Sequence, residues 1–448
     1  MRTNTKTVHP GPRTHEGAPA KRITTLQELE RSVMACMLWE DEFYESGTAI
    51  ATRIMQLVEA LCAEGRAADV RRVGLRARQE EGLRHVPLLI CSCLAAYGEL
   101  TPAMVRGVCD RADLMGELIS VYWTVNGGKR PLPASMKKGL GQAFTRFDAH
   151  QLAKYSGRNA AVSPRDVMFL THPKPSNERE AETWRKLANG ELGSPDTWEV
   201  ALSGGADKGE TFTRLIGEGK LGTLALIRNL RSMERAGVDR TVIRSALQQA
   251  SAARILPFQV IAAAKHAPSF EQDLEEFLFR ACGNLAPLRG RTAVVVDCSG
   301  SMDAALSRRG TMSRREAAVG TAMIVREVCE DAVPIAFGDV VKTLRPRRGF
   351  ALRDQIMRSD VGHSTNMGDA ARHAFKQNVD RVILFTDEQS VQRLPDPPEG
   401  VHGYVVNVAS AQNGIGYGTW THIDGFSTNI LRYIPELEAH DEWVPVAG

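Results

Sequence analysis

The segment Thr25–Leu285 carries the hydrophobic periodicity of α-helices. Apolar residues recur at spacings of three and four, as at Ile50, Ile54, Leu57 and Leu61, which places them on one face of a helix. The helical stretches are short and often end at glycine, and short joins separate them. Arrays of this kind usually stack helix pairs, and no strict sequence period is present. The pattern therefore predicts an α-helical solenoid of HEAT-like repeats.

From about Arg291 the pattern changes to continuous apolar runs rich in β-branched residues. Four such runs are Thr292–Val296, Val333–Phe337, Arg381–Phe385 and Gly403–Val408. Helical stretches alternate with them at Arg314–Cys329, Arg353–Arg358 and Met367–Lys376. Buried strands that alternate with helices are typical of a mostly parallel, doubly wound α/β sheet covered on both faces. Ligands bind such sheets at the carboxyl ends of the strands.

These patterns predict three parts: a flexible tail at residues 1–20, a helical-repeat domain at 21–288 and an α/β domain at 289–448. The first 20 residues have no apolar core, so they do not resemble a secretory signal. The longest apolar stretch, Val86–Tyr97, is about a dozen residues, whereas a membrane span needs roughly 20. We therefore expect no membrane association.

Overall charge and cysteine content add two expectations. Lys and Arg number 56 and Asp and Glu number 53, so the net charge is only +3 and any basic surface must come from local clustering. The eight cysteines include no CxxC pair and lie mostly among apolar residues. They are expected to be buried thiols in a reducing cytoplasm.

An oxygen-rich loop directly follows the first predicted strand. It places Asp297, Ser299 and Ser301 at alternate positions, and carboxylates and hydroxyls are ligands that hard divalent cations prefer. Two later loops could complete the site: Gly362–Asn366 precedes a helix, and Thr386–Glu388 follows the apolar run Arg381–Phe385.

Taken together, the three loops resemble the metal-ion-dependent adhesion site of a von Willebrand factor A domain. The resemblance implies a metal set of Asp297, Ser299, Ser301, Thr365 and Asp387. Mg²⁺ is the preferred ion because every ligand is an oxygen, with Ca²⁺ or Mn²⁺ as alternatives. The hydroxyl ligands supply no charge, so a bound ion would take an acidic group from a partner protein at an open coordination position.

Enzyme motifs fit the same residues poorly. An aspartyl-phosphate phosphatase needs DxD after its first strand, and the third residue here is Ser299. A nucleophile elbow needs GxSxG, and a nucleotide-binding P-loop needs GxxxxGK[ST]; neither is present. We therefore expect a protein without catalysis of its own.

The stretch Gly127–Arg165 has a large excess of basic residues, with Asp148 as its one acid. The basic residues are Lys129, Arg130, Lys137, Lys138, Arg146, Lys154, Arg158 and Arg165. Phe144, Phe147 and Tyr155 lie among them, and cations interleaved with aromatics suit RNA phosphates and stacked bases. The alternative is a solvated basic helix face.

The order of the two domains and several local motifs resemble the Ro ribonucleoprotein autoantigen family, which is defined by the TROVE module. The motifs are NGGKRPLPASMKKGLGQAF, LAKYSGRNAAVSPRDVMFLTHPKP and WTHIDGFSTNILRYI. The resemblance implies a monomeric ring in which the A domain joins the ends of the solenoid. It also implies that small noncoding Y-type RNA binds the outer face and that single-stranded ends of misfolded RNA enter the hole.

On the matching motif, Lys154, Arg158 and His172 correspond to family residues that contact RNA. Lys129, Arg130, Lys137 and Lys138 are further candidates for RNA contact. The leading hypothesis is a cytoplasmic RNA-binding protein that holds a noncoding RNA or presents RNA ends to an exoribonuclease. The alternatives are a scaffold that grips an acidic partner through the metal, and a partner of a motor ATPase.

Overall fold

The computed structural model describes residues 11–20, 22–34, 36, 38, 45–156, 160–193, 196–253, 255–283, 285, 287–306, 311–409, 411–425 and 430–441. The chain forms two compact units. A helical unit comprises Cys36–Glu40 and Gly47–Ala281, and an α/β unit comprises Met1–Ala35, Asp41–Ser46 and Cys282–Gly448. Three segments of the chain thus form the α/β unit, and two segments form the helical unit.

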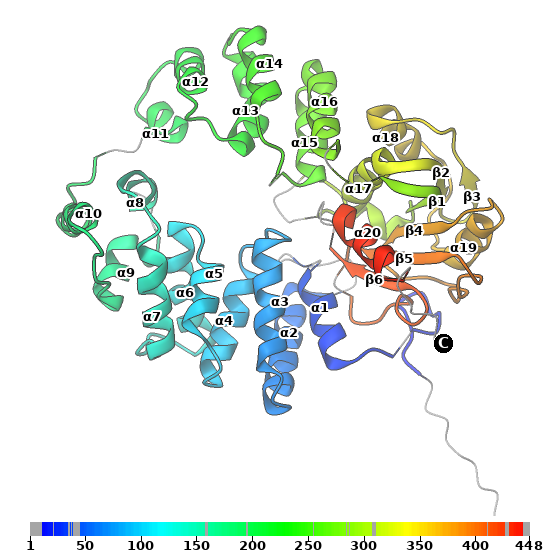
Figure 1. Cartoon of the computed structure of the whole chain (residues 1–448), viewed down its shortest axis with the longest axis horizontal. Helices are drawn as coiled ribbons and strands as arrows, with labels where there is room; N and C mark the ends of the chain where they lie inside the picture. Colours follow the sequence, from blue (N-terminus) through cyan, green and yellow to red (C-terminus); the bar gives the residue numbers. More distant parts are fainter. Residues whose placement is uncertain are drawn as a thin grey trace, which may run out of the picture. The chain divides into compact units, whose positions relative to one another are not determined.

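The helical unit is built from short helices (Figure 1). They are α2 (Gly47–Ala63), α3 (Ala67–Gln79), α4 (Val86–Ala96), α5 (Pro102–Val108), α6 (Ala112–Val125), α7 (Ala134–Phe144), α8 (Ala149–Ser156), α9 (Pro164–Thr171), α10 (Glu178–Asn189), α11 (Trp198–Ser203), α12 (Lys208–Gly217), α13 (Thr223–Arg235), α14 (Arg240–Gln249), α15 (Pro257–His266), the 3₁₀ turn η1 (Pro268–Phe270) and α16 (Glu271–Cys282).

Helices pack both on their neighbours in sequence and on the next helix but one. Contacts of the second kind join α2 to α4, α4 to α6, α5 to α7 and α7 to α9, as expected for stacked helix pairs. α4 is central to this packing, because all its residues from Val86 to Leu94 are buried. An amphipathic helix buries one stripe, so burial on all sides indicates neighbours on each face.

The α/β unit contains a six-stranded sheet with the strand order β3-β2-β1-β4-β5-β6. Its strands are β1 (Leu288–Asp297), β2 (Cys329–Phe337), β3 (Val341–Thr343), β4 (Arg381–Thr386), β5 (His402–Asn407) and β6 (Thr421–Asp424). The strands pair in parallel except β3, which is antiparallel to β2. The helices of the unit are α1 (Thr25–Met34), the 3₁₀ turn η2 (Gly300–Asp303), α17 (Arg314–Val328), α18 (Gly349–Met357), α19 (Met367–Phe375) and α20 (Ile430–Asp441).

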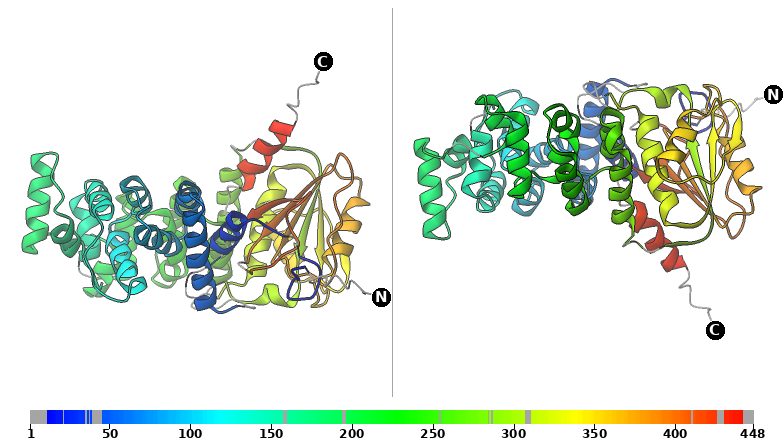
Figure 2. Two further views of the ribbon diagram at one scale, coloured as in Figure 1. Left: turned by 90° about the horizontal axis from the view of Figure 1, so that it is seen from below. Right: turned by 90° about the horizontal axis from the view of Figure 1, so that it is seen from above.

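Helices cover both faces of this sheet, as Figure 2 shows. On one face, Ala293 and Val295 of β1 join a core cluster with Met367 and Ala371 of α19. Their neighbours along β1 are also fully buried, which explains why the strand is continuously apolar rather than alternating. The four predicted strands are all present, and the two shortest strands, β3 and β6, lie outside the four predicted runs.

The N-terminal segment packs in the α/β unit, which differs from the predicted division of the chain. Residues 1–10 of the predicted flexible tail lie outside the described part of the chain. Within the described part, Thr14 Oγ1 donates a hydrogen bond to the Ser390 carbonyl at 2.7 Å, and Ala18 is buried in the sheet's core cluster. Helix α1 contacts β6 rather than starting the helical unit.

The cysteines form no disulfide; seven are buried and Cys62 is half-buried, as predicted. No helix in the described ranges is long and apolar enough to cross a bilayer.

Candidate nucleic-acid interface and metal centre

A basic pocket of about 810 Å³ lies on the helical unit. Residues from α5, α7 and the end of α9 line it: Arg106, Ala134, Lys137, Lys138, Gly141, Gln142, Thr145, Thr171, His172, Pro173 and Lys174. Three of the predicted RNA-binding residues meet here, namely Lys137, Lys138 and His172. No lining residue is acidic, so the pocket presents uncompensated positive charge.

Close packing of α7 against α5 positions the two lysines. A Cβ atom at Gly139 would lie 2.5 Å from Cβ of Val105, so glycine allows the two helices to approach. Arg146, just beyond α7, donates a hydrogen bond to the Arg106 carbonyl at 2.9 Å and ties the ends of both helices together. Lys137 and Lys138 are exposed on this fixed scaffold, and neighbouring α9 supplies the opposite wall.

His172 ends helix α9 in the left-handed region, with φ 47° and ψ 56°. Its backbone N–H donates to the Met168 carbonyl at 2.9 Å, and Pro173 prevents the helix from continuing. The other end of α9 begins with the predicted Ser163–Pro164 signal, where Ser163 and Asp166 form a capping box. A residue other than glycine in the left-handed region is uncommon, and here it places an exposed imidazole at the pocket.

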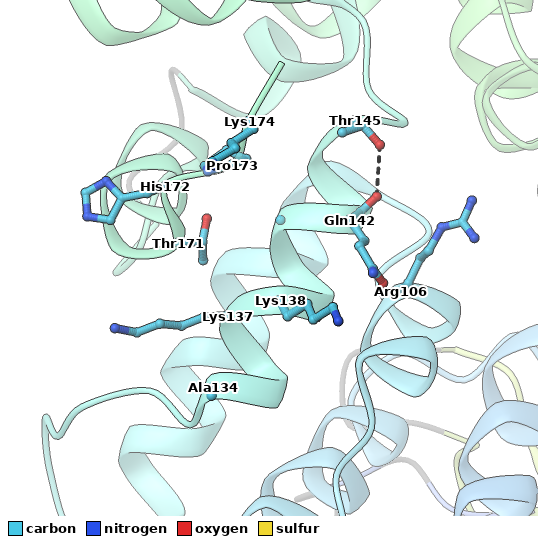
Figure 3. Close-up of a pocket in the computed structure, with 11 residues that line it drawn as sticks. Arg106, Ala134, Lys137, Lys138, Gln142, Thr145, Thr171, His172, Pro173 and Lys174 are labelled. Atoms are coloured by element: carbon cyan, nitrogen blue, oxygen red, sulfur yellow. Dashed lines mark hydrogen bonds between the residues drawn. The ribbon is translucent and has the colours of Figure 1, made fainter. Parts of the chain in front are cut away.

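The basic side chains leave the pocket in two directions (Figure 3). Lys137 and His172 extend toward the same side, whereas Lys138 extends toward Arg106. An extended polyanion that crosses the pocket would therefore meet cations at both margins.

The remaining predicted RNA-binding residues do not line this pocket. Lys129 and Arg130 lie exposed in the loop after α6, where Lys129 Nζ is 5.4 Å from the centre of the Trp123 ring. Lys154 on α8 is 5.9 Å from the centre of the Tyr155 ring. Arg158 lies outside the described residues.

The expected interleaving of exposed aromatics with these cations is wrong for two of three residues. Phe144 and Phe147 are buried, and the Phe144 ring packs edge-on against Trp184 with centroids 5.2 Å apart. Tyr155 is half-buried and accepts a hydrogen bond from Arg111 at 3.1 Å. The helical period explains the burial of Phe144, which lies on the buried face of α7, whereas Phe147 lies in the connection between α7 and α8.

Sequence reasoning missed two cations of the pocket, Arg106 and Lys174. Arg106 comes from α5, outside the basic stretch, so only the fold reveals its position. Lys174 lies within the quoted LTHPKP motif, two residues after His172, and that proximity was the available signal.

The predicted metal residues meet at the carboxyl end of the sheet in the α/β unit. Asp297, Ser299, Ser301, Thr365 and Asp387 are all buried, with exposures of 0–5 %. Hydrogen bonds join their three loops. The Gly300 N–H donates to the His363 carbonyl at 2.8 Å, and Ser390 Oγ donates to the Thr365 carbonyl at 2.9 Å.

The first aspartate of this group is held on both carboxylate oxygens. Ser299 N–H donates to Asp297 Oδ1 at 2.9 Å, and Thr386 Oγ1 donates to Asp297 Oδ2 at 2.7 Å. The Ser299 and Ser301 hydroxyl oxygens are 3.3 Å apart, so both point into one small space. This arrangement offers carboxylate and hydroxyl oxygens to a single cation.

The electrostatics of the group favour a cation. Burial, together with the negative charge of Asp387, raises the pKa of Asp297 to about 7. Burial also raises the pKa of Asp387, against hydrogen bonding from Ser301 and the charge of Arg314. Two buried carboxylates thus repel each other in the absence of a positive ion.

The second carboxylate provides the test of whether a metal fits. Asp387 Oδ2 is buried and has no hydrogen-bond donor within the described ranges, and Arg314 Nη1 lies 3.9 Å from it. An unbonded carboxylate oxygen beside hydroxyl oxygens matches the donor set of Mg²⁺ or Ca²⁺. The described residues contain no group of three or more His, Cys, Asp and Glu arranged to hold a metal, so such a site depends on the hydroxyls.

Residues 189–333 match the family model of the TROVE domain. The match begins at the end of α10 and runs into β2, so it spans parts of both units. The predicted resemblance to this family is confirmed, although the basic pocket lies outside the matched TROVE residues.

The fold is similar to that of the Ro (Rsr) protein of Deinococcus radiodurans, with a TM-score of 0.57 and 16% sequence identity. The similarity covers 92% of this chain and 100% of that chain. At this identity the likeness establishes the fold, a helical region followed by a mostly parallel α/β sheet, which confirms the predicted fold class. Closure of the helices into a ring stays a prediction.

Proposed function

We propose that the chain is an RNA-binding protein and that the basic pocket is its principal RNA contact. The observation that carries the proposal is the convergence of Lys137, Lys138 and His172 with Arg106 and Lys174 in a pocket without acidic residues. Phosphate groups supply most of the affinity in such contacts. The TROVE domain and the Ro fold support the same role.

The RNA classes of the proposal follow the family resemblance. They are a small structured noncoding RNA of the Y type and single-stranded ends of misfolded RNA, held for quality control or for transfer to an exoribonuclease. Structured RNA suits a pocket that offers cations without stacking aromatics, because Phe144 and Phe147 are buried. The role is binding rather than catalysis.

Ultraviolet crosslinking of the full chain to its co-purified RNA tests this proposal. Mass spectrometry should find crosslinked peptides that contain residues 134–145 and 171–174, and sequencing of the RNA identifies its class. An absorbance ratio at 260 and 280 nm that shows no nucleic acid, together with no crosslinks to these peptides when RNA is added, would contradict it.

We propose a second function for the α/β unit, which is to bind an acidic side chain of a protein partner through a divalent cation. Asp297, Ser299, Ser301, Thr365 and Asp387 would hold the ion, with Mg²⁺ preferred and Ca²⁺ or Mn²⁺ as alternatives. The unbonded, buried Asp387 Oδ2 favours this proposal. The ion would supply a positive charge with an open coordination position for a carboxylate.

Surface plasmon resonance with an immobilised aspartate-containing peptide tests the second function. Binding in Mg²⁺ that a chelator removes supports it. Peptide binding that is equal in Mg²⁺ and in chelator would contradict it.

A further inference from the structure

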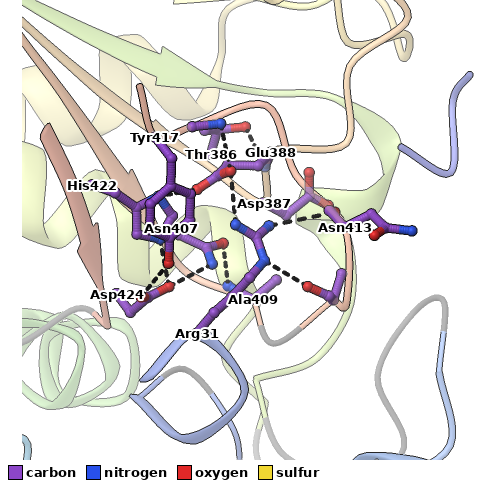
Figure 4. Close-up of polar contacts among 12 residues, drawn as sticks. Arg31, Thr386, Asp387, Glu388, Asn407, Ala409, Asn413, Tyr417, His422 and Asp424 are labelled. Atoms are coloured by element: carbon purple, nitrogen blue, oxygen red, sulfur yellow. Dashed lines mark hydrogen bonds and ion pairs between the residues drawn. The ribbon is translucent and has the colours of Figure 1, made fainter. Parts of the chain in front are cut away.

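A buried arginine joins the N-terminal helix to the α/β sheet. Arg31 of α1 has no exposed surface, and its Nη1 donates to Glu388 Oε2 at 2.8 Å (Figure 4). Its Nε donates to the Ala411 carbonyl at 2.6 Å. Burying a charge is costly unless it is paired, so these two partners fix the position of α1.

Glu388 is the centre of a larger buried network. Its Oε1 lies 2.7 Å from His422 Nδ1, and its Oε2 accepts a hydrogen bond from the Gly416 N–H at 2.8 Å. His422 Nε2 in turn lies 2.7 Å from Asp424 Oδ1. Glu388 also has a positive φ of 61°, a conformation that the surrounding contacts must sustain.

The network leads directly to the proposed metal ligands. Glu388 follows Asp387 in sequence, and its N–H donates to Thr386 Oγ1 at 3.0 Å. Thr386 Oγ1 donates to Asp297 Oδ2 at 2.7 Å. Hydrogen bonds that are linked through the covalent structure of Glu388 therefore connect Arg31 to Asp297, the first proposed ligand of the site.

The N-terminal segment also contacts the same loop at a second place. Thr14 Oγ1 donates to the Ser390 carbonyl at 2.7 Å, and the His15 N–H donates to Gln389 Oε1 at 2.8 Å. Ser390 Oγ donates to the carbonyl of Thr365, another predicted ligand. Both ends of the segment Thr14–Arg31 therefore contact the loop Asp387–Ser390.

We propose that the segment Thr14–Met34 is a clasp that positions Asp387 and Asp297, so that metal binding and docking of the N-terminal helix stabilise each other. The proposal rests on the metal site proposed above. Arg31 acts as a positioning residue, because it reaches the ligands only through Glu388 and Thr386.

The test compares Arg31→Met with wild type in the full chain, using Mg²⁺ alone as the probe. Glu388 keeps His422 as a cationic partner in this variant, which favours folding. Calorimetry should show about tenfold weaker Mg²⁺ binding in Arg31→Met. The control is Arg22→Met, since Arg22 is exposed on the same segment, and its Mg²⁺ affinity should equal that of wild type.

Hydrogen exchange supplies the reciprocal measurement. Saturating Mg²⁺ should slow amide exchange in residues 14–34 of wild type, and this slowing should be lost in Arg31→Met, because linkage requires equal effects in both directions. If Arg31 served stability alone, Arg31→Met would change the amide exchange rates of residues 14–34, but Mg²⁺ would still slow that exchange as it does in wild type. If Arg31→Met does not fold, Thr14→Val serves instead. It removes the hydroxyl that donates to the Ser390 carbonyl and accepts from the Ala18 N–H, and it should weaken Mg²⁺ binding about threefold.

The outcomes separate the two proposals. Mg²⁺ binding by wild type that the clasp variants leave unchanged overturns the coupling and leaves the metal site intact. Absence of Mg²⁺ binding by folded wild type overturns both. Weaker binding together with loss of the Mg²⁺-dependent protection supports the clasp.

Discussion

The two candidate sites of this protein differ in how their charges are arranged. In the helical unit, the cations of the basic pocket are exposed, and few contacts restrict their side chains. In the α/β unit, the oxygens of the metal residues are buried and hydrogen-bonded across three loops. Exposed charges act through a summed field that salt screens, whereas buried groups act through fixed geometry.

This difference determines how each site should respond to change. Removing one cation from the basic pocket should reduce affinity by a modest factor, because the others remain. Removing one buried ligand should abolish binding, because no neighbour can replace its position. Each prediction below tests one side of that contrast.

The largest expected effect is on metal binding by Asp297→Ala. With Asp297 removed, Asp387 is the one charged ligand left, so Mg²⁺, Ca²⁺ and Mn²⁺ should show no heat of binding in calorimetry. The control is Asp303→Ala on the same loop, since the Asp303 side chain is 53% exposed and pairs with Arg315. RNA affinity should not change in either variant, and equal metal binding by wild type and Asp297→Ala would show that the ligands are misplaced.

A smaller effect is expected from His172→Gly in the basic pocket. Glycine adopts the φ of 47° without the roughly 1 kcal/mol that other residues require, so the thermal midpoint should stay equal or rise. RNA affinity should fall about fivefold, which corresponds to the loss of one net hydrogen bond of about 1 kcal/mol. Unchanged RNA affinity, measured by fluorescence anisotropy, would assign His172 a purely structural role as a helix cap.

The smallest expected effect is a pH dependence of stability in the network around His422. Burial lowers the pKa of His422, but Asp424 and Glu388 outweigh burial and raise it to about 9. Burial raises the pKa of Glu388, but Arg31 and His422 lower it to about 2. Tyr417 stacks on the imidazole with ring centroids 3.9 Å apart and completes its surroundings.

The direction in which stability changes with pH follows from these two pKa shifts. A raised histidine pKa stabilises the fold fully below about pH 6.5 and loses that effect as the pH rises through 9. Glu388 adds a stabilising effect above about pH 4.5 that is lost as the pH falls toward 2. Thermal midpoints of wild type should exceed those of His422→Gln by several degrees at pH 6.5, and the gap should shrink by pH 9.5. A gap that is constant with pH would show that His422 is neutral.

The sequence was sufficient for the sheet core and for the proximity of the proposed metal residues. Thr292–Val296 and Arg381–Phe385 are apolar throughout because both faces of their strands are covered, and this pattern is readable without a structure. Asp297, Ser299 and Ser301 follow a strand end directly, so their proximity is local. Thr365 and Asp387 were added by the resemblance to the metal-ion-dependent adhesion site.

The sequence was insufficient where long-range contacts decide the outcome. Arg31 lies in an amphipathic helix and resembles a surface residue, but its partner Glu388 is 357 positions away. The packing of α1 in the α/β unit therefore could not be predicted. Similarly, Arg106 joins Lys137 only because α5 packs on α7.

The most direct test of RNA binding by the basic pocket is the salt dependence of affinity for a single-stranded RNA, measured for wild type and for the double variant Lys137→Glu, Lys138→Glu. Four cationic side chains line the pocket, so the log–log slope for wild type should be about −3, from roughly −0.7 for each phosphate. The double variant should bind at least about tenfold more weakly for all RNA sequences, with a slope of about half that value. Lys208→Glu, an exposed lysine on α12, should leave both quantities unchanged. A flat salt response in wild type, or equal affinity of wild type and the double variant, would contradict the account.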